Sequence, residues 1–188
     1  MKNVMSFLKK HWPLMIKPVV VLVVICICVS AALAVTNYIT APIIAEGDLI
    51  RNNGARVELF PAEAYNKLEG EWAGVTEAYE VVTGDAVIGY IITGVTKGYG
   101  GDVPVMVAID TAGSIVGIQI SGTEETQGLG SKIEETAFKD QFKGLAASAV
   151  TLNTDVQQVA GATVSSAAAV TAVNSAIDAF AAITGKGA

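Results

Sequence analysis

A long run of apolar residues dominates the first quarter of the chain. No charged residue lies between Pro18 and Ala45, and most positions there are Val, Ile, Leu, Cys or Ala. About 20 apolar residues suffice for a helix that spans a bilayer, so we predict one transmembrane helix at residues 18–40. Four lysines precede the run and the first acidic residue, Glu46, follows it. The positive-inside rule therefore predicts a cytoplasmic segment at 1–17, a single pass through the cell (inner) membrane, and an extracytoplasmic remainder.

A cleaved signal peptide is the alternative for this run. The small residues Ala32 to Ala34 match a cleavage pattern. The apolar run continues well past them to Ile44, which favours an uncleaved anchor in the lipid bilayer. Cys26 and Cys28 lie inside the run in a C-x-C spacing. They could ligate a metal shared with another subunit, but apolar thiols buried in the membrane are the favoured interpretation.

A helical connector is expected at residues 41–74. The polar segment from Glu46 to Leu59 reads as a continuation of the membrane helix, and Pro61 should then start a short helix or turn. Arg51 and Arg56 are expected on a solvated face of this helix, with lipid headgroups as an alternative contact.

Strand-like patterns follow from residue 75. The segment 78–94 contains two β-rich runs joined by Gly84-Asp85, which is a strong hairpin signal. Further strands are indicated by apolar residues at alternate positions, where a sheet would bury one side: Val103, Val105, Val107 and Ile109, then Val116, Ile118 and Ile120. This alternation predicts an antiparallel sheet. Pro104 indicates either an edge position or the start of a strand.

Helical patterns come after the strands. In the segment 131–144, Ser131 and Glu134 have capping-box spacing, and Phe138 and Phe142 stand one turn apart. An Ala-rich helix is expected from Ser165 to Ile183, packed on the sheet through its larger apolar residues, Val170, Val173, Ile177 and Phe180. The predicted fold class is α+β: a small antiparallel sheet with packed helices at 75–188, on one N-terminal transmembrane helix.

The part of the chain after the anchor has few reactive groups. The single His and both Cys residues lie within the first 28 positions. This excludes a His- or Cys-based catalytic site, a zinc site and an iron–sulfur site there, so any redox work needs a cofactor. All eighteen acidic residues but only eight of the basic ones follow the anchor, a net charge of −10. Such a surface does not suit nucleic acid.

Two glycine-rich segments are candidates for binding. The segment GYGGD at 98–102 lacks the strand–loop–helix setting of a nucleotide loop, so a tight turn with close backbone approach is favoured. The segment TEETQGLGSKIEE at 123–135 leads from a strand into a helix and can present backbone N–H groups and an apolar side chain. Glu124 and Glu125 could form a general acid–base pair, although adjacent carboxylates more often form a solvated rim.

The segment AGATVSS at 160–166 opens the last predicted helix. The first turn of a helix offers unpaired N–H groups and a partial positive charge, which together favour a bound phosphate. Gly161 leaves room for close approach, and Thr163, Ser165 and Ser166 add hydroxyl groups. Ordinary capping of the helix by Ser or Thr is the alternative.

Taken in order behind an N-terminal anchor, these motifs resemble the FMN-binding domain of the G subunit of the Rnf electron-transport complex. The C subunit of Na⁺-translocating NADH:quinone reductase shares that domain. The matching stretches are KGYGGDVPVMVAID, EETQGLGSKIEE and AGATVSS. The resemblance covers about residue 46 to the end. It implies covalent FMN, joined by a phosphoester to Thr163 by a separate flavin transferase that uses FAD.

The resemblance also implies the residues around the cofactor. Those near the phosphate are Gly161, Ala162, Val164, Ser165 and Ser166; those near the isoalloxazine are Glu125, Thr126, Gly128, Leu129 and Gly130. Lys132 would stabilise the anionic reduced flavin.

Two positions depart from the family pattern. Ala160 stands where Ser or Thr is usual, and Gln157 where Asp is frequent, with Asp155 the nearest acid. Ser165 and Ser166 are the alternative acceptors should the transferase not use Thr163.

The expected function follows from the resemblance. The chain would be an electron-relay subunit of a membrane-bound ferredoxin:NAD⁺ oxidoreductase, coupled by the whole complex to translocation of Na⁺ or H⁺. Its partners would be the other subunits, and it would have no catalytic residues or metal ligands of its own. The alternatives are a C-type subunit of the quinone reductase, a membrane-anchored FMN-binding or sensory module, and an assembly subunit without flavin.

Overall fold

The computed structural model describes residues 2–120, 122–123 and 125–185. The chain divides into two units, 1–50 and 51–188. Helix α1 (Lys2–Leu59) forms the first unit and extends into the second. Its segment Ile16–Pro42 is long and apolar enough to cross a membrane, and none of it is buried by the protein. At about 1.5 Å per residue, 27 helical residues exceed the ~30 Å hydrocarbon core.

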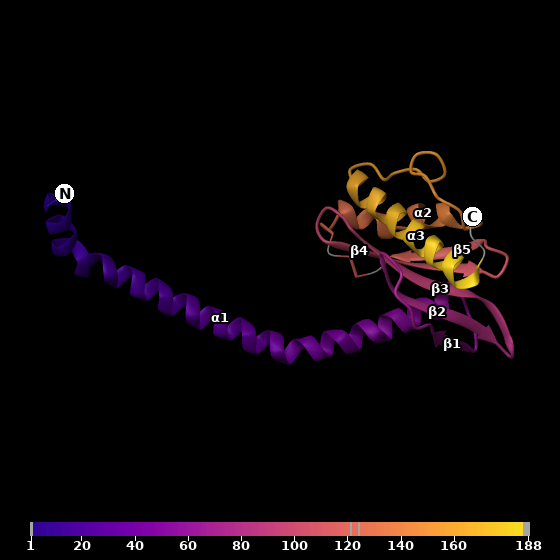
Figure 1. The fold of residues 1–188 in the computed structure, drawn as a ribbon, viewed down its shortest axis with the longest axis horizontal. Helices are drawn as coiled ribbons and strands as arrows, with labels where there is room; N and C mark the ends of the chain where they lie inside the picture. Colours follow the sequence, from indigo (N-terminus) through magenta and orange to yellow (C-terminus); the bar gives the residue numbers. More distant parts are fainter. Residues whose placement is uncertain (1, 121, 124, 186–188) are drawn as a thin grey trace. The chain divides into compact units, whose positions relative to one another are not determined.

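The second unit contains one five-stranded antiparallel sheet (Figure 1). Its strands follow one another as a meander, in the order β1 (Ala64–Lys67), β2 (Val75–Thr83), β3 (Ala86–Lys97), β4 (Asp102–Asp110) and β5 (Ile115–Ile120). The α+β class with an antiparallel sheet is confirmed. The hairpin at Gly84-Asp85 is also confirmed, because Thr83 pairs with Ala86 across the turn.

Two details of the strands differ from the expectation. The helix ends at Leu59, residues 60–63 form a bend, and β1 follows at Ala64–Lys67, all inside the segment 41–74 that we expected to be a helical connector. Pro104 lies in a central strand, and its strand-start interpretation is the right one. Proline lacks an N–H, and the pairing of β4 with β5 begins only at Val105.

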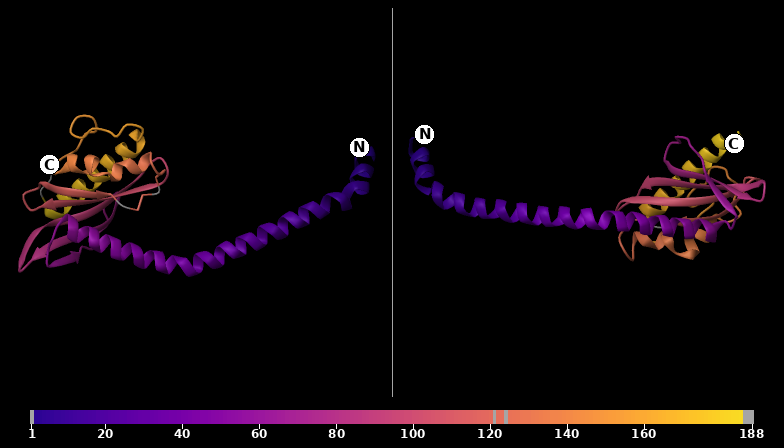
Figure 2. Two further views of the ribbon diagram at one scale, coloured as in Figure 1. Left: turned by 180° about the vertical axis from the view of Figure 1, so that it is seen from behind. Right: turned by 90° about the horizontal axis from the view of Figure 1, so that it is seen from below.

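Helix α3 (Thr163–Thr184) covers one face of the sheet (Figures 1 and 2). As the sequence predicts, Val170, Val173, Ile177 and Phe180 are all buried against the strands. Helix α3 is apolar enough to pass as a membrane span, but half of it is buried in this core. At the closest approach, a Cβ on Gly94 would lie 2.0 Å from the carbonyl oxygen of Ala172. The helix therefore packs directly on the backbone of β3.

The opposite face of the sheet is also buried, which the one-sided alternation did not predict. The C-terminal end of α1 covers it, with a second cluster formed by Ala55, Val81, Ile91, Met106 and Ala108. Arg56 fastens this contact. Its guanidinium lies 2.7 Å from the Glu77 carboxylate and 3.8 Å from the centre of the Tyr79 ring, and the side chain is only 7% exposed. The expectation that Arg56 lies on a solvated face is therefore wrong.

The single helix predicted at 131–144 is instead three short turns, η1 (Gly130–Glu134), α2 (Thr136–Lys139) and η2 (Asp140–Phe142). The capping box does not form. Ser131 Oγ accepts from Gly128 N–H, and the Glu134 carboxylate accepts from the Thr123 hydroxyl. Phe138 and Phe142 do stack edge to face in the core, as their spacing predicts, with ring centres 5.5 Å apart.

The substitution Gly94→Ala should destabilise the domain by about 3 kcal/mol, because its methyl group has no room against α3. Urea unfolding of the full chain in detergent measures this effect. Gly54→Ala is the matched control: its Cβ meets nothing within 4 Å in helix α1, and alanine in a helix should add about 0.5–1 kcal/mol. Equal stabilities of the two variants would contradict the packing described.

Candidate functional site

The start of helix α3 is not capped by any side chain. The helix begins at Thr163, and the capping position is taken by Ala162, whose methyl group accepts no hydrogen bond. The first N–H groups of a helix have no intrahelical carbonyl partner. Capping by Ser or Thr, the alternative drawn from the sequence, is therefore not what this segment does. An open cluster of backbone donors with partial positive charge remains at this end.

The three hydroxyl groups of the first turn differ in access to solvent. Thr163 is exposed, whereas Ser165 and Ser166 are 1% and 0% exposed. Ser166 Oγ accepts from Val159 N–H at 3.1 Å, which joins the preceding loop to the helix. Only Thr163 therefore presents its hydroxyl for modification without unfolding of the turn.

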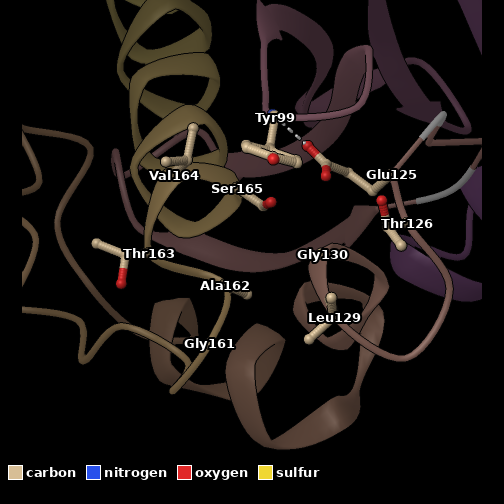
Figure 3. A pocket seen from close by; sticks show the side chains of 10 residues that line it. All are labelled: Tyr99, Glu125, Thr126, Leu129, Gly130, Gly161, Ala162, Thr163, Val164 and Ser165. Carbon is tan, nitrogen blue, oxygen red and sulfur yellow. Dashed lines mark hydrogen bonds between the residues drawn. The ribbon is translucent and has the colours of Figure 1, made fainter.

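A cavity of about 330 Å³ lies beside this helix start (Figure 3). In the close-up, Ser165 points into the cavity, and Thr163 stands at its outer edge. Leu129 and Gly130 from the loop before η1 form part of the wall. Ligand pockets begin at roughly 300 Å³, so this cavity is at the small end of the range in which pockets bind small molecules.

Glu125 joins the two glycine-rich segments that form the cavity wall. The residue is 5% exposed, and its carboxylate accepts from the backbone N–H groups of Tyr99 at 2.8 Å and Gly100 at 3.3 Å. The carboxylate leaves no space for side chains beside it: a Cβ would lie 2.0 Å from it at Gly98 and 2.2 Å at Gly130. Because Gly98 and Gly130 have no Cβ, they leave the space that the buried carboxylate occupies.

Most of the site residues expected from the sequence line this cavity: Glu125, Thr126, Leu129, Gly130, Gly161, Ala162, Thr163, Val164 and Ser165. Gly128, Lys132 and Ser166 do not. Gly128 has a φ of +77°, which the turn before Leu129 requires. Lys132 lies on η1 and is half-buried. Glu124, the proposed partner of Glu125 in an acid–base pair, lies outside the described residues.

Tyr99 also lines the cavity, and the sequence reasoning missed it. The segment GYGGD was interpreted only as a turn with close backbone approach. The available signal was the large aromatic residue between its glycines, but nothing in the sequence indicated which segment the turn would face.

The positions that depart from the family pattern lie in the loop before α3. Gln157 exchanges two backbone hydrogen bonds with the side-chain amide of Gln141. Asp155 accepts from Thr151 N–H at 2.8 Å and so closes its own turn. The nearest acidic residue is thus already hydrogen-bonded within the loop.

Among the described residues, no group of three or more His, Cys, Asp or Glu could hold a metal ion.

Residues 98–178 match the model of the FMN-binding domain. This range contains every residue of the cavity wall, from Tyr99 to Ser165. The match therefore assigns an FMN-binding domain to the part of the fold that carries the site.

Relatives of at least 30% identity match most of the chain. The G subunit of the proton-translocating ferredoxin:NAD(+) oxidoreductase complex of Clostridium ljungdahlii is 30% identical, over 87% of this chain and 90% of the relative. The G subunit of the Na(+)-translocating complex of Acetobacterium woodii is 33% identical, over 90% and 93%. The chain belongs to this G subunit family. A G subunit of an ion-translocating oxidoreductase complex of Stutzerimonas stutzeri is more distant, at 27% identity over 82% of this chain and 75% of the relative.

Membership of the G subunit family confirms the resemblance inferred from the motifs. It also makes the chain a component of a multisubunit oxidoreductase, so other subunits of such a complex are its partners. The apolar segment of α1 agrees with the membrane association of these complexes.

Replacement of Glu125 by Gln should destabilise the domain by about 2 kcal/mol, because each carboxylate oxygen accepts from a different backbone N–H and the amide would turn its own NH₂ group toward one of these donors. Urea unfolding measures the change. Glu69→Gln removes an exposed carboxylate and should stay within about 0.5 kcal/mol of wild type. A loss no larger than that of the control would contradict the role of Glu125.

Proposed function

We propose that the chain carries FMN in a phosphoester bond to Thr163 and relays electrons between neighbouring redox centres of an Rnf-type ferredoxin:NAD⁺ oxidoreductase. The observation that carries this proposal is the exposed Thr163 hydroxyl at the uncapped start of α3, beside a cavity and inside the FMN-binding domain. Ser165 and Ser166, the alternative acceptors, are buried, which argues against their modification in the folded chain.

The attachment is a phosphoryl transfer from FAD, made by a separate flavin transferase. Thr163 Oγ1 attacks the phosphorus on the FMN side of the pyrophosphate, and a new P–O bond forms. The bond to the bridging oxygen breaks, AMP leaves, and the hydroxyl proton passes to a base of the transferase or to water. No oxidant or reductant is needed, since every atom keeps its oxidation state.

The first turn of α3 suits the resulting phosphodiester. The linkage keeps one negative charge, which the N-terminal end of a helix stabilises by about 0.3–1 kcal/mol at an exposed site. Ala162 places no competing acceptor there, and Gly161, at φ +82°, meets nothing within 4 Å of an added Cβ. The buried Ser165 hydroxyl adds a polar group from the cavity side.

FMN would supply the one- and two-electron chemistry that the described side chains lack. The cavity is small, so its walls would enclose part of the ring system and leave an edge at the surface. Such an edge suits exchange of electrons with a neighbouring subunit rather than with a diffusing substrate. Lys132 is not part of the cavity wall, so we assign it no direct contact with the flavin.

The proposed orientation places residues 1–17 in the cytoplasm and the FMN-binding domain outside it. Lysines at one end of the apolar segment and acidic residues at the other support this topology. The two similar relatives are named for different ions, protons in one and Na(+) in the other. We therefore propose that the whole complex, and not this chain, determines which ion is translocated.

The alternative functions have less support. A C-type subunit of the quinone reductase shares the FMN-binding domain, but the relatives that match most of the chain are G subunits. A membrane-anchored FMN-binding or sensory module would use the same threonine, but both of these relatives are named as subunits of oxidoreductase complexes. An assembly subunit without flavin would have no use for an exposed threonine at an open helix start.

Thr163→Ala should abolish covalent flavin. Protein purified from the native host, which supplies the transferase, should fluoresce in a denaturing gel when it is wild type. The variant should not fluoresce. Its intact mass should be lower than that of the wild type by the mass of FMN minus one water, apart from the substitution itself. Thr171→Ala is the matched control, because this second exposed threonine lies on the same helix away from its start. Equal fluorescence of wild type and Thr163→Ala would overturn the attachment.

The topology predicts that alkaline phosphatase fused after residue 185 is active in cells. The enzyme folds only outside the cytoplasm, so activity reports the side of the membrane. A green fluorescent protein fused at the same position and exported in an unfolded form should stay dark. An inactive phosphatase together with a bright fluorescent fusion would reverse the proposed orientation.

A further inference from the structure

Tyr99 is an aromatic residue without a packing partner. The residue is 78% exposed although it borders the cavity. The other tyrosines of the second unit are engaged: Tyr65 donates to the Phe60 carbonyl, Tyr79 lies under Arg56, and Tyr90 packs edge to face on Phe180. Among the described residues, the Tyr99 ring makes no comparable contact. A single exposed ring is common on a protein surface, but this one borders a cavity, and ligand pockets are lined mainly by apolar and aromatic side chains.

The backbone that carries this ring is held firmly. Tyr99 N–H donates to the buried Glu125 carboxylate, and Gly98 N–H donates to the Gly101 carbonyl at 2.8 Å. Glu125 belongs to the same loop as Leu129, so one carboxylate fixes the backbone on both sides of the cavity. The backbone of Tyr99 therefore belongs to a hydrogen-bonded turn, and the ring can move only by rotation about the side-chain torsions.

Exposed apolar side chains surround the same cavity. Leu129 is 53% exposed and Val164 52% exposed, and both belong to the cavity wall with Tyr99. In Figure 3, Tyr99 and Leu129 stand on different sides of the cavity, with Ser165 between them in the view. Two apolar walls separated by a gap and joined to a phosphate position at Thr163 fit a flat aromatic ring whose phosphate is anchored at the helix start.

We propose that Tyr99 stacks on the isoalloxazine ring and covers it on the side opposite Leu129, while Glu125 positions Tyr99 through the backbone. This inference rests on the proposed function, since the ring belongs to FMN on Thr163. Aromatic rings attract one another in offset or edge-to-face geometry beyond the gain from buried area. Tyr99 is a positioning residue that sets the orientation and solvent exposure of the ring. Glu125 acts only through Tyr99 and the loop.

The stacked phenol gives the proposal an optical signature that a structural role would not produce. An excited flavin takes an electron from an adjacent phenol and returns it without net reaction, so its emission is quenched. Phenylalanine stacks equally well but donates poorly, and alanine does neither. Emission therefore reports the phenol, and visible circular dichroism reports a ring held in a chiral site.

The test compares full-length wild type, Tyr99→Phe and Tyr99→Ala, flavinylated in the native host and purified in detergent. Flavin emission is measured in the folded protein and divided by emission after denaturation, which corrects for the amount of covalent flavin. We expect this ratio to rise several-fold in Tyr99→Ala, because the quenching phenol is removed. In Tyr99→Phe it should also rise, while the visible circular dichroism stays at the wild-type level; in Tyr99→Ala that signal should be lost. Val116→Ala changes an exposed residue outside this cavity and should leave both readouts unchanged.

Two outcomes overturn the inference, and they are distinguishable. Equal emission ratios and equal visible circular dichroism in wild type and Tyr99→Ala, with equal covalent flavin after denaturation, would refute stacking and leave Thr163 as the attachment site. Tyr99 would then be free to face another subunit. No flavin on the wild-type chain from the native host would instead overturn the proposed function, and the inference with it.

Discussion

The site depends on the open first turn of α3. A helix that begins with alanine at its capping position leaves several backbone N–H groups without a partner. Such donors are costly when they are buried and useful when they face a ligand. Here the capping position is occupied by Ala162, the adjacent Thr163 is exposed, and a cavity lies alongside. A negatively charged group on Thr163 would accept hydrogen bonds from these donors, and the N-terminal end of the helix would stabilise its charge.

The rest of the fold keeps this turn in place. The meander sheet is buried on both faces, by α3 on one and by the end of α1 on the other. Gly94 lets α3 lie directly on β3, which fixes the position of the helix on the sheet. Glu125 then ties the turn after β3 to the loop after β5. The cavity thus lies between three segments that are distant in sequence but held by buried contacts.

The sequence predicted what depends on local periodicity. Alternating valines indicated the antiparallel strands, Gly84-Asp85 indicated the hairpin, and the spacing from Val170 to Phe180 indicated the buried side of α3. The motif order predicted most of the cavity wall and the FMN-binding domain. What escaped prediction depends on contacts between distant segments. Glu125 and Tyr99 are 26 positions apart, and the burial of Arg56 depends on Glu77, 21 positions away.

Local motifs also failed where a distant partner competed. Ser131 and Glu134 have capping-box spacing, but Glu134 binds Thr123 and the chain forms short turns instead of one helix. The Ala-rich helix was expected from Ser165, with residues 160–166 at its opening and capping by Ser or Thr as the alternative. The helix begins two residues earlier, at Thr163, and Ala162 at the capping position leaves this end without a side-chain cap.

The measurement that tests the account most directly is the location of the modification within the chain. Protein from the native host is cleaved, and the flavin-bearing peptide is sequenced by tandem mass spectrometry under conditions that preserve phosphoesters. The account predicts FMN phosphate on Thr163, with Ser165 and Ser166 unmodified. Flavin on either serine, or on a peptide outside the first turn of α3, would contradict it.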